Sequence, residues 1–310
     1  MASQNLNPLF SAGISKNIIY NMDAWMSPIH KIFHFGTTKM RVIDHQMWAG
    51  YGLPGSRLPG EPIQAGSISA SFAKRYVVNN FGLLDSFPME DINDDIYGII
   101  NLGIPKVGGG MARSFQDQYD TDTAAWFSTS GYGTSPQYMA DGKSLFNTAH
   151  PVSSTNAATW SNRPSTDVDL SIASVQAGIT NLRLQKLPNN ISYANVNPRI
   201  LVINPAQSFV AQQIVKQTLE VGTADHNDNF IKPYDIEIVQ WPFFQVSGAT
   251  GSNNAWFLVG DDHFLNFFMR SDFETDSDKD INTNSQIVIG TSRYAFGADD
   301  ARFTYGSKGS

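Results

Sequence analysis

The stretch GYGLPGSRLPGEPIQAG, residues 50–66, restricts the fold more than any other part of the sequence. Its five glycines and three prolines exclude an interior strand or helix. Apolar side chains then alternate at period two, interrupted by Lys74, as in a strand with one buried face: Ile68, Ala70, Phe72, Tyr76 and Val78. Extended segments on both sides of such a tip predict a long projecting hairpin. Because an isolated two-stranded ribbon is marginally stable in water, we expect this hairpin to rest on another surface, such as that of another subunit.

The composition restricts the class of protein. A chain of 310 residues can bury a large core in one domain or in two moderate ones. The absence of cysteine excludes disulfides and thiolate zinc sites and is typical of a reducing compartment. No signal-peptide pattern or membrane-length apolar run occurs, so we expect neither secretion by signal peptide nor a membrane span. A net charge of −7 without a basic stripe argues against a dedicated nucleic-acid-binding protein, although such a surface can lie beside packed DNA.

Residues 1–44 are typical of an extended arm rather than of a domain. The segment mixes polar and turn-forming residues with isolated large apolar side chains, which include Phe10, Trp25, Phe33 and Phe35. A segment of this kind cannot bury these side chains by itself. We therefore expect them to need a neighbour's surface, or the surface of their own domain if the arm is an ordinary N-terminal extension.

The longest predicted helix lies near residues 103–128. The acidic stretch PMEDINDDIYGI suits a helix start, and Pro105 suits the first helical position. An apolar stripe follows at helical spacing: Val107, Met111, Phe115, Tyr119 and Trp126. The three glycines at 108–110 cost about 1 kcal/mol each relative to alanine, a cost that close backbone packing can offset.

The remainder of the chain mixes helices and strands. Residues 129–168 form a long loop rich in Ser, Thr, Asn and Gly, and a second helix is predicted at 169–186. The segment PAQSFVAQQIVKQTLE predicts a further helix with Phe209, Ile214 and Leu219 among its apolar positions. Strands are predicted in RILVINP, YDIEIVQWPFF and AWFLVG, and two more in the tail SQIVIGTSRYAFGADDARFTYG, broken at FGADD. The order of elements indicates an α+β fold, without repeats and without a linker that divides the chain.

The loop segment DGKSLFNTAHP, residues 141–151, is the best candidate for catalysis. Asp141, Ser144 and His150 could supply an orienting acid, a nucleophile and a base. A catalytic triad is defined by its geometry in space, however, and the G-x-S-x-G nucleophile elbow is absent. A structural interpretation fits better: Asp and Gly form a turn, Leu145 and Phe146 anchor the loop, and the residue before Pro151 is held extended.

No metal, cofactor or phosphate site is predicted. The six histidines are scattered, and only His30 and His34 share a helical i,i+4 spacing. The acidic segments TADHNDN and SDKDINTNS lack the full calcium-loop pattern, and KVGGG is not followed by the residues of a phosphate-binding loop. The sequence therefore favours a protein that is not an enzyme and that needs no cofactor.

Five strings, in order along the chain, resemble the major head (capsid) subunit of Mu-like tailed phages. They are MEDINDDIYGI (89–99), DGKSLFNTAHP (141–151), PRILVINPAQSFVAQQIV (198–215), AWFLVG (255–260) and RYAFGADDARFTYGSKG (293–309). The last string places Asp300 and Arg302 near the Asp-Arg pair of that family. The first 85 residues resemble the family in their types of residue but not in their exact sequence.

The resemblance implies the Hong Kong 97-like capsid fold. It assigns an N-terminal arm to residues 1–44, an extended loop to 45–85, a peripheral domain with a spine helix to 86–189, an axial domain to 190–280 and return strands of the peripheral domain to 281–310. It implies a major capsid protein that assembles as hexamers and pentamers into an icosahedral head around double-stranded DNA. The expected partners are further copies of the chain, portal and scaffolding proteins, decoration proteins, and DNA that is contacted weakly and non-specifically.

The expected location is the virion capsid, assembled in the cytoplasm of the host bacterium, with a separate scaffolding protein because the short polar start does not indicate a scaffolding segment. Two alternatives remain open: an encapsulin-like nanocompartment shell, and a hydrolase that uses Ser144 and His150. The expected assembly contacts are Phe10, Trp25, Trp48, Leu53, Arg57, Leu58, Glu61 and Ile63.

Overall fold

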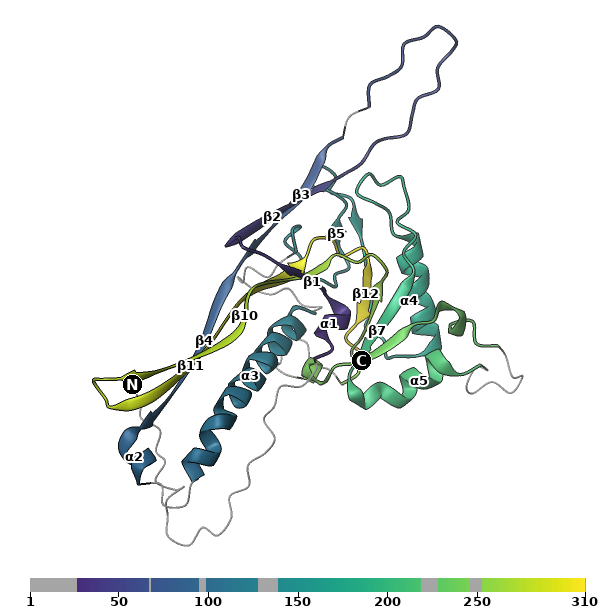
Figure 1. Cartoon of the computed structure of the whole chain (residues 1–310). Coiled ribbons are helices and arrows are strands. Elements are labelled where there is room, and N and C mark those ends of the chain that lie inside the picture. Colours follow the sequence, from purple (N-terminus) through teal and green to yellow (C-terminus); the bar gives the residue numbers. More distant parts are fainter. Residues whose placement is uncertain are drawn as a thin grey trace.

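The computed structural model of the chain describes residues 27–66, 68–94, 99–127, 139–218, 228–245 and 253–309. In these ranges two four-stranded sheets form the body, helices pack on them, and a two-stranded hairpin projects from one side (Figure 1). The α+β class that the sequence predicts is confirmed.

The first sheet contains the longest strands of the described chain. Its strands lie in the order β1 (His34–Thr37), β10 (Leu265–Asp280), β11 (Ser285–Ala298) and β4 (Asn79–Pro88). β1 runs parallel to β10, and the other neighbours are antiparallel. A short helix, α1 (Ile29–Ile32), precedes β1, and another, α2 (Met89–Asn93), follows β4. The far ends of β10, β11 and β4 extend well beyond β1 and form a long extension of the sheet (Figure 1).

The long helix α3 (Ile99–Trp126) lies along one face of this sheet (Figure 1). The predicted apolar stripe is confirmed for four positions, which are buried: Met111, Phe115, Tyr119 and Trp126. The tight packing requires Gly290 on β11, where an added Cβ would lie 2.9 Å from the Phe273 ring and 3.2 Å from the Phe115 ring. The predicted start was wrong: the helix begins at Ile99, and Pro105 lies inside it. Packing of the apolar face outweighs the loss of one backbone donor.

The second sheet is smaller and is covered by two helices. Its strands lie in the order β12 (Thr304–Ser307), β9 (Trp256–Gly260), β7 (Pro198–Ile203) and β8 (Glu237–Gln240). One face packs on α4 (Ile172–Leu184) and α5 (Ser208–Lys216). The opposite face, which includes Val202 and Phe257, joins Phe127 and Phe146 in the core that it shares with the first sheet. A capping box formed by Ser171 and Ser174 starts α4.

The structure decides between the two interpretations of the arm for one residue and corrects one apolar position. Phe33 packs on its own subunit, as expected if the arm is an ordinary N-terminal extension: it is 3% exposed and its ring lies edge-on to that of Phe127 at 5.8 Å. Phe209 is not an apolar core position of α5, because it is 78% exposed while Ile214 is buried. The structure also assigns the strands to sheets: β10 joins the first sheet and β12 the second. Strand pairing depends on partners far apart in sequence, which periodicity cannot identify.

A buried carboxyl on α3 gives the fold a testable pH dependence. Asp120 is fully buried, and its Oδ1 accepts hydrogen bonds from Ser27 Oγ (2.5 Å) and Trp241 Nε1 (2.9 Å). Burial raises the pKa of Asp120 from 3.8 to about 6. The folded state therefore takes up a proton at higher pH than the unfolded chain. This contribution to stability is present at low pH and is lost as the pH rises through about 6.

The isosteric Asp120→Asn variant, which keeps an acceptor oxygen, isolates this effect. Between pH 7 and pH 5 the free energy of unfolding of the wild type should rise by roughly 1 kcal/mol relative to the variant. Urea unfolding of the unassembled subunit measures this difference. His263 has the opposite sign, because burial lowers its pKa to about 4, but it is present in both proteins and cancels. A difference that stays constant over this pH range would contradict the assignment.

Candidate functional site

The predicted hairpin is the most prominent surface feature of the described chain. β2 (Val42–Trp48) and β3 (Ala70–Val77) pair antiparallel, and their connection extends away from the body (Figure 1). The root of the hairpin rests on the face of the first sheet that is opposite α3. There Tyr76 and Val78 are buried together with Ala295, and Phe268 packs against them. This packing anchors the ribbon on its own subunit at the root.

The Asp299 carboxylate joins the hairpin root to the body. It accepts hydrogen bonds from Tyr76 Oη (2.6 Å) and Asn266 Nδ2 (2.9 Å) and lies 2.9 Å from His45 Nδ1. Burial raises the pKa of the Tyr76 hydroxyl, so this group stays protonated and donates. Burial also lowers the pKa of Lys74 to about 8, although the Asp299 charge opposes that shift. A single side chain therefore fixes groups from both hairpin strands and from β10.

The tip of the hairpin, residues 50–66, carries apolar side chains that its own subunit leaves exposed. Leu53 is 75%, Leu58 68% and Ile63 79% exposed. Arg57 and Glu61 hold the turn closed: Arg57 Nη1 donates to the Glu61 carbonyl (2.8 Å), and Glu61 Oε2 accepts from the Leu58 amide (2.9 Å). The tip thus has an ordered polar turn between exposed apolar side chains.

The predicted assembly residues have different positions in the structure. Trp48, at the end of β2, is 62% exposed. Arg57 donates to the backbone carbonyl of Glu61, the Glu61 carboxylate accepts from the Leu58 amide, and both side chains are at the surface. Phe10 and Trp25 lie outside the described residues. The contacts of all these residues with other subunits stay predictions.

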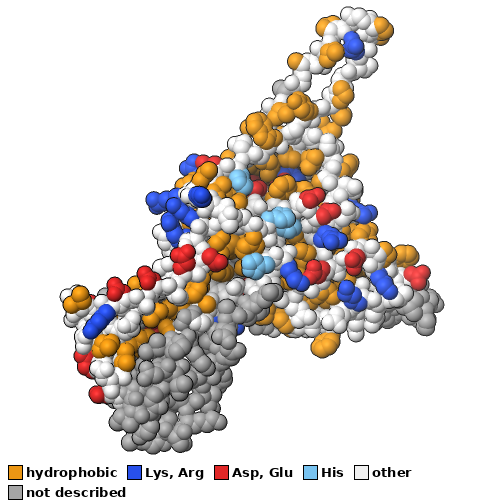
Figure 2. All heavy atoms as spheres, in the orientation of Figure 1, with side chains coloured by type: hydrophobic (Ala, Val, Ile, Leu, Met, Phe, Trp, Pro, Cys, Tyr) orange, Lys and Arg blue, Asp and Glu red, His pale blue; other side chains and the backbone are white. Residues whose placement is uncertain are grey.

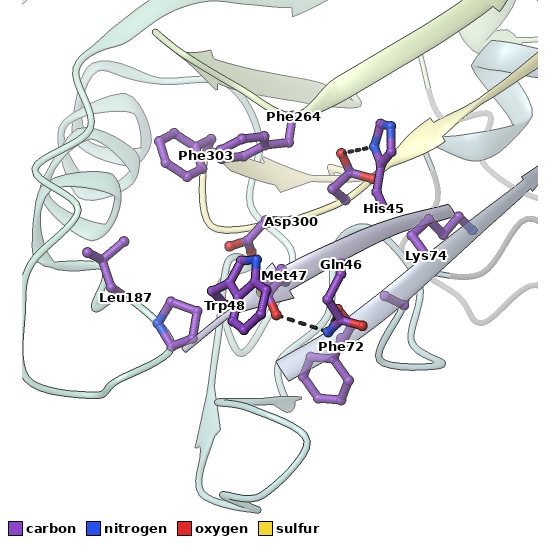
Figure 3. Close-up of a pocket in the computed structure, with 13 residues that line it drawn as sticks. His45, Gln46, Met47, Trp48, Phe72, Lys74, Leu187, Phe264, Asp300 and Phe303 are labelled. Atoms are coloured by element: carbon purple, nitrogen blue, oxygen red, sulfur yellow. Dashed lines mark hydrogen bonds and ion pairs between the residues drawn. The ribbon is translucent and has the colours of Figure 1, made fainter. Parts of the chain in front are cut away.

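A cavity of about 330 Å³ lies between the hairpin root and the body (Figure 3). Residues from several segments line it, among them Trp48, Phe72, Leu187, Phe264 and Phe303. Its polar lining consists of His45, Gln46, Lys74, Asp299 and Asp300. The sequence gives no sign of this cavity, because its walls come from segments that are far apart in the chain.

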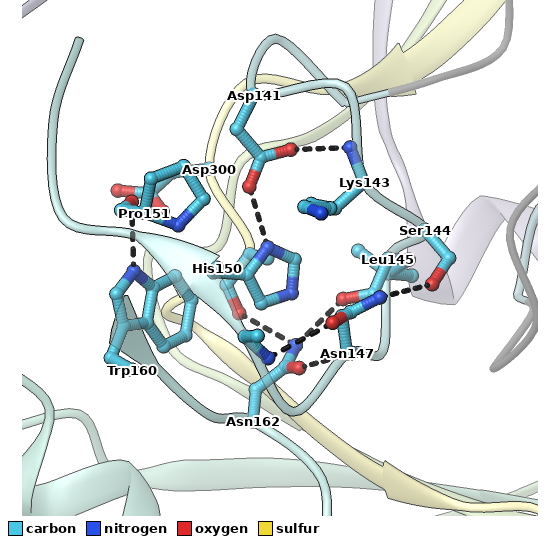
Figure 4. Close-up of polar contacts among 12 residues, drawn as sticks. Asp141, Lys143, Ser144, Leu145, Asn147, His150, Pro151, Trp160, Asn162 and Asp300 are labelled. Carbon is cyan, nitrogen blue, oxygen red and sulfur yellow. Dashed lines mark hydrogen bonds and ion pairs between the residues drawn. The ribbon is translucent and has the colours of Figure 1, made fainter. Parts of the chain in front are cut away.

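The loop segment 141–151 forms a structural clasp rather than a nucleophile and its base (Figure 4). Asp141 Oδ2 lies 2.6 Å from His150 Nδ1, so the predicted acid and base do meet. Ser144 Oγ, however, donates to the Phe146 carbonyl at 3.1 Å, and within the described residues it makes no hydrogen bond to His150. Both Ser144 and His150 are buried. Leu145 is buried as well, so the predicted anchoring of the loop is confirmed.

The clasp is fixed by polar contacts to neighbouring segments. Asn162 Nδ2 donates to the Leu145 carbonyl (2.7 Å), and its Oδ1 accepts from the Asn147 amide (2.9 Å). The His150 ring stacks on Trp160 with a centroid separation of 4.6 Å. A buried loop needs such partners for its backbone groups. The residues of the clasp therefore have a structural explanation.

Within the described ranges, no group of three or more His, Asp or Glu side chains is placed to hold a metal ion. No helix in the same ranges is both long and apolar enough to cross a membrane.

Among the comparisons with known proteins, the match of the sequence to a family model is the clearest. A family model described as phage capsid protein matches residues 79–306. No curated protein sequence matches the chain.

Solved structures resemble the whole chain. A protein described as Microbacterium phage Oxtober96 has a TM-score of 0.58 at 10% identity and covers 98% of both chains. The capsid structure of Cyanophage P-SCSP1u has a TM-score of 0.58 at 11% identity, covering 98% of this chain and 94% of the other. The capsid of Myoviridae Phage XM1 has a TM-score of 0.57 at 9% identity, covering 100% and 99%. At these identities the likeness concerns the fold.

Proposed function

The chain belongs to the phage capsid protein family, as a major capsid protein that forms the shell of a phage head, and from this premise we propose that its copies assemble as hexamers and pentamers into an icosahedral head around double-stranded DNA. The Hong Kong 97-like fold expected from the sequence resemblance is confirmed. The matching family is not restricted to Mu-like phages, so that finer assignment stays a prediction. Membership in this family also favours a phage head over an encapsulin-like compartment.

The observation that carries the proposal is the exposed apolar tip of the hairpin. Soluble monomers seldom expose contiguous apolar surface of this kind, whereas interaction sites do. Leu53, Leu58 and Ile63 lie on a ribbon that projects away from the body, where their own subunit provides no apolar partner among the described residues. A neighbouring subunit provides such a partner in a shell. Once one contact has formed, further contacts within the shell become effectively intramolecular.

The segments of the chain have proposed roles in this shell. We assign the arm to residues 1–44 and the extended loop to 45–85. The packing of residues 29–37 on the body and the pairing of residues 79–85 with β11 support placing these two segments in the peripheral domain. The peripheral domain contains α3 and the first sheet. Its strand membership supports placing residues 265–280 there rather than in the axial domain. The axial domain contains the second sheet, and the pairing of β12 with β9 supports including residues 304–307 in it.

Other partners follow from the same role. Portal, scaffolding and decoration proteins would bind the shell, which assembles in the cytoplasm of the host bacterium. A net charge of −7 supports weak and non-specific contact with the packaged DNA, because many phosphate contacts would immobilise it. The buried Ser144, which donates to a backbone carbonyl, supports a structural protein without hydrolase activity.

Assembly of the purified chain tests the proposal. We expect size-exclusion chromatography to show capsomers or larger particles, and negative-stain electron microscopy to show closed shells or capsomer rings. The reason is that each subunit presents an unsatisfied apolar surface that only other copies cover. A monomer at every concentration, with no particles by electron microscopy, would contradict the proposed function.

A further inference from the structure

The far end of β10 carries a row of carboxylates along one face of the first sheet. We call Glu274, Asp276 and Asp278 the acidic edge. These side chains are exposed, and they form no ion pair with any residue in the described ranges. β1 pairs with β10 only at residues 266–269, so beyond Met269 this side of β10 has no neighbouring strand in the described chain.

The acidic edge faces away from α3. Phe273 points toward α3, because its ring lies 5.0 Å from that of Phe115. Thr275 is opposite Gly290, which packs against Phe115 of α3, and successive residues of a strand point to opposite faces, so Glu274, Asp276 and Asp278 point away from α3. The backbone amides of Ser277 and Lys279 donate to the carboxylates of Asp276 and Asp278, at 2.8 and 2.7 Å. These bonds involve one oxygen of each carboxylate and hold the row in order.

An exposed apolar strip lies beside the acidic edge on the same face. Asp276 is opposite Ile289 in the β10–β11 register, and Ile289 is opposite Leu84 in the β11–β4 register. Residues opposite each other in a sheet share a face. Ile289 is 37% and Leu84 45% exposed. This sheet face therefore combines carboxylates with apolar side chains and has no covering element in the described chain.

Cations gather at the other end of the same sheet, beside the hairpin root. We call this group the basic root, and it contains Lys39, Arg41, Arg270 and Arg293. The turn between β1 and β2 is held there by bonds from the Thr38 amide to the Met269 carbonyl and from the Val78 amide to the Arg41 carbonyl, both 2.9 Å. Arg293 donates to Asn80 Oδ1 at 2.6 Å. None of these four cations forms an ion pair with a described residue.

The basic root also has exposed apolar neighbours: Met40 is 66% and Val42 38% exposed. Figure 2 shows Lys and Arg side chains (blue) gathered beside the hairpin root. Asp and Glu side chains (red) follow the long extension of the first sheet toward its far end. One chain thus presents two patches of opposite charge, each next to apolar side chains.

The two patches cannot neutralise each other within one subunit. Arg270 lies on the same strand as the three carboxylates of the acidic edge, and four to eight residues at about 3.3 Å each separate them from it by roughly 13–26 Å. Such a distance is beyond the reach of a side chain and exceeds the Debye length at physiological salt. Their complementary partners must therefore come from outside the subunit, and a second copy supplies both.

We propose that the acidic edge of one subunit docks on the basic root of a neighbouring copy in the shell, with the Leu84–Ile289 strip covered by the same contact. This inference rests on the proposed function. The contact joins two different patches, so each subunit keeps one free patch of each kind for the next copy. Such head-to-tail contacts close into rings when the rotation permits. Exposed ion pairs contribute little each, but complementary patches fix the orientation of the partners and speed their encounter.

Charge exchange tests the pairing. We expect Asp276→Lys/Asp278→Lys and, separately, Lys39→Glu/Arg41→Glu to reduce the yield of particles by about tenfold or more at low salt. Both pairs of changes in one chain should restore assembly. Thr275→Lys/Ser277→Lys is the matched control, because its lysines lie on the same strand but face the other side. That variant should assemble like the wild type.

The outcomes separate this inference from the proposed function. A wild-type chain that forms no particles contradicts the proposed function itself. Particles formed by the wild type and equally by both single-patch variants contradict only the docking contact. Loss of assembly in the acidic-edge variant alone would overturn it too, because the partner would then be a different basic molecule.

A cross-linking measurement covers variants that fail to fold. The chain has no cysteine, so Asp276→Cys and Arg41→Cys can be introduced in separate preparations and mixed before assembly. A short thiol-specific cross-linker should then join the two variants into a dimer on a denaturing gel, whereas Thr275→Cys with Arg41→Cys should give at most a trace. Equal yields from both mixtures would contradict the contact.

Discussion

Replacing Arg302 with methionine is expected to lower the free energy of unfolding of the subunit by about 3–5 kcal/mol. The guanidinium is 2% exposed, and its Nη1 lies 3.0 and 2.9 Å from the two oxygens of Asp300. Its Nε donates to the Lys186 carbonyl (2.7 Å) and its Nη2 to the Val152 carbonyl (2.6 Å). The guanidinium also lies over the Trp160 ring, 4.8 Å from its centroid. Methionine fills a similar volume but leaves two carbonyls without this donor and a buried carboxylate with only the backbone amide of residue 302.

The arginine also explains why a loop so rich in polar residues can be buried. Its guanidinium connects the segment around residue 302 with Val152, directly after the clasp, and with Lys186, directly after α4. Three segments that are far apart in sequence thus depend on one side chain. Removing it exposes several unsatisfied groups together, which is why the expected effect is larger than for an ordinary surface substitution.

Urea unfolding of the unassembled subunit measures this effect. Arg199→Met, at an exposed position on β7, is the matched control and should change the free energy of unfolding by less than about 0.5 kcal/mol. Adding Asp300→Asn to Arg302→Met should recover part of the loss, because it removes the uncompensated buried charge. Equal stability of Arg302→Met and Arg199→Met would contradict the role assigned to the arginine.

Local sequence patterns predicted the elements whose structure depends on local chemistry. Glycine and proline set the projecting tip at 50–66, and the four-residue spacing of Met111, Phe115 and Tyr119 set the buried face of α3. The Asp-Gly turn and the anchoring of Leu145 follow from similar short-range rules. Five short strings in order were also sufficient to indicate the family, which the match over residues 79–306 confirms.

The features that the sequence did not reveal depend on contacts between distant segments. Asp299 joins His45, Tyr76 and Asn266, which lie 33 to 254 positions away from it along the chain. The acidic edge is recognisable only when β10 is known to be an edge strand beyond residue 269. Alternating acidic residues in an isolated segment are consistent with any solvated strand. The cavity beside Trp48 was missed for the same reason.

Removing the tip of the hairpin is expected to abolish shell formation while the subunit still folds. The same contact can be removed without a deletion. A triple variant in which Leu53, Leu58 and Ile63 are each replaced by serine keeps the backbone and the Arg57–Glu61 turn. Burial of a Leu or Ile side chain contributes about 1.5–3 kcal/mol, so the loss of three such contacts per subunit should lower the yield of particles by about a hundredfold or more. Electron microscopy and size-exclusion chromatography measure the yield.

The stability of the isolated subunit should hardly change in this variant. The three side chains are 68–79% exposed, so the fold gains little from them, and the root remains fixed through Asp299. Ser56→Ala, which alters the same tip without removing an apolar side chain, should assemble normally. The two measurements are decisive together, because a misfolded subunit would lose both properties. Shells of normal yield from the triple serine variant would show that the exposed tip is not an assembly contact, and the observation that carries the hexamer and pentamer proposal would no longer support it.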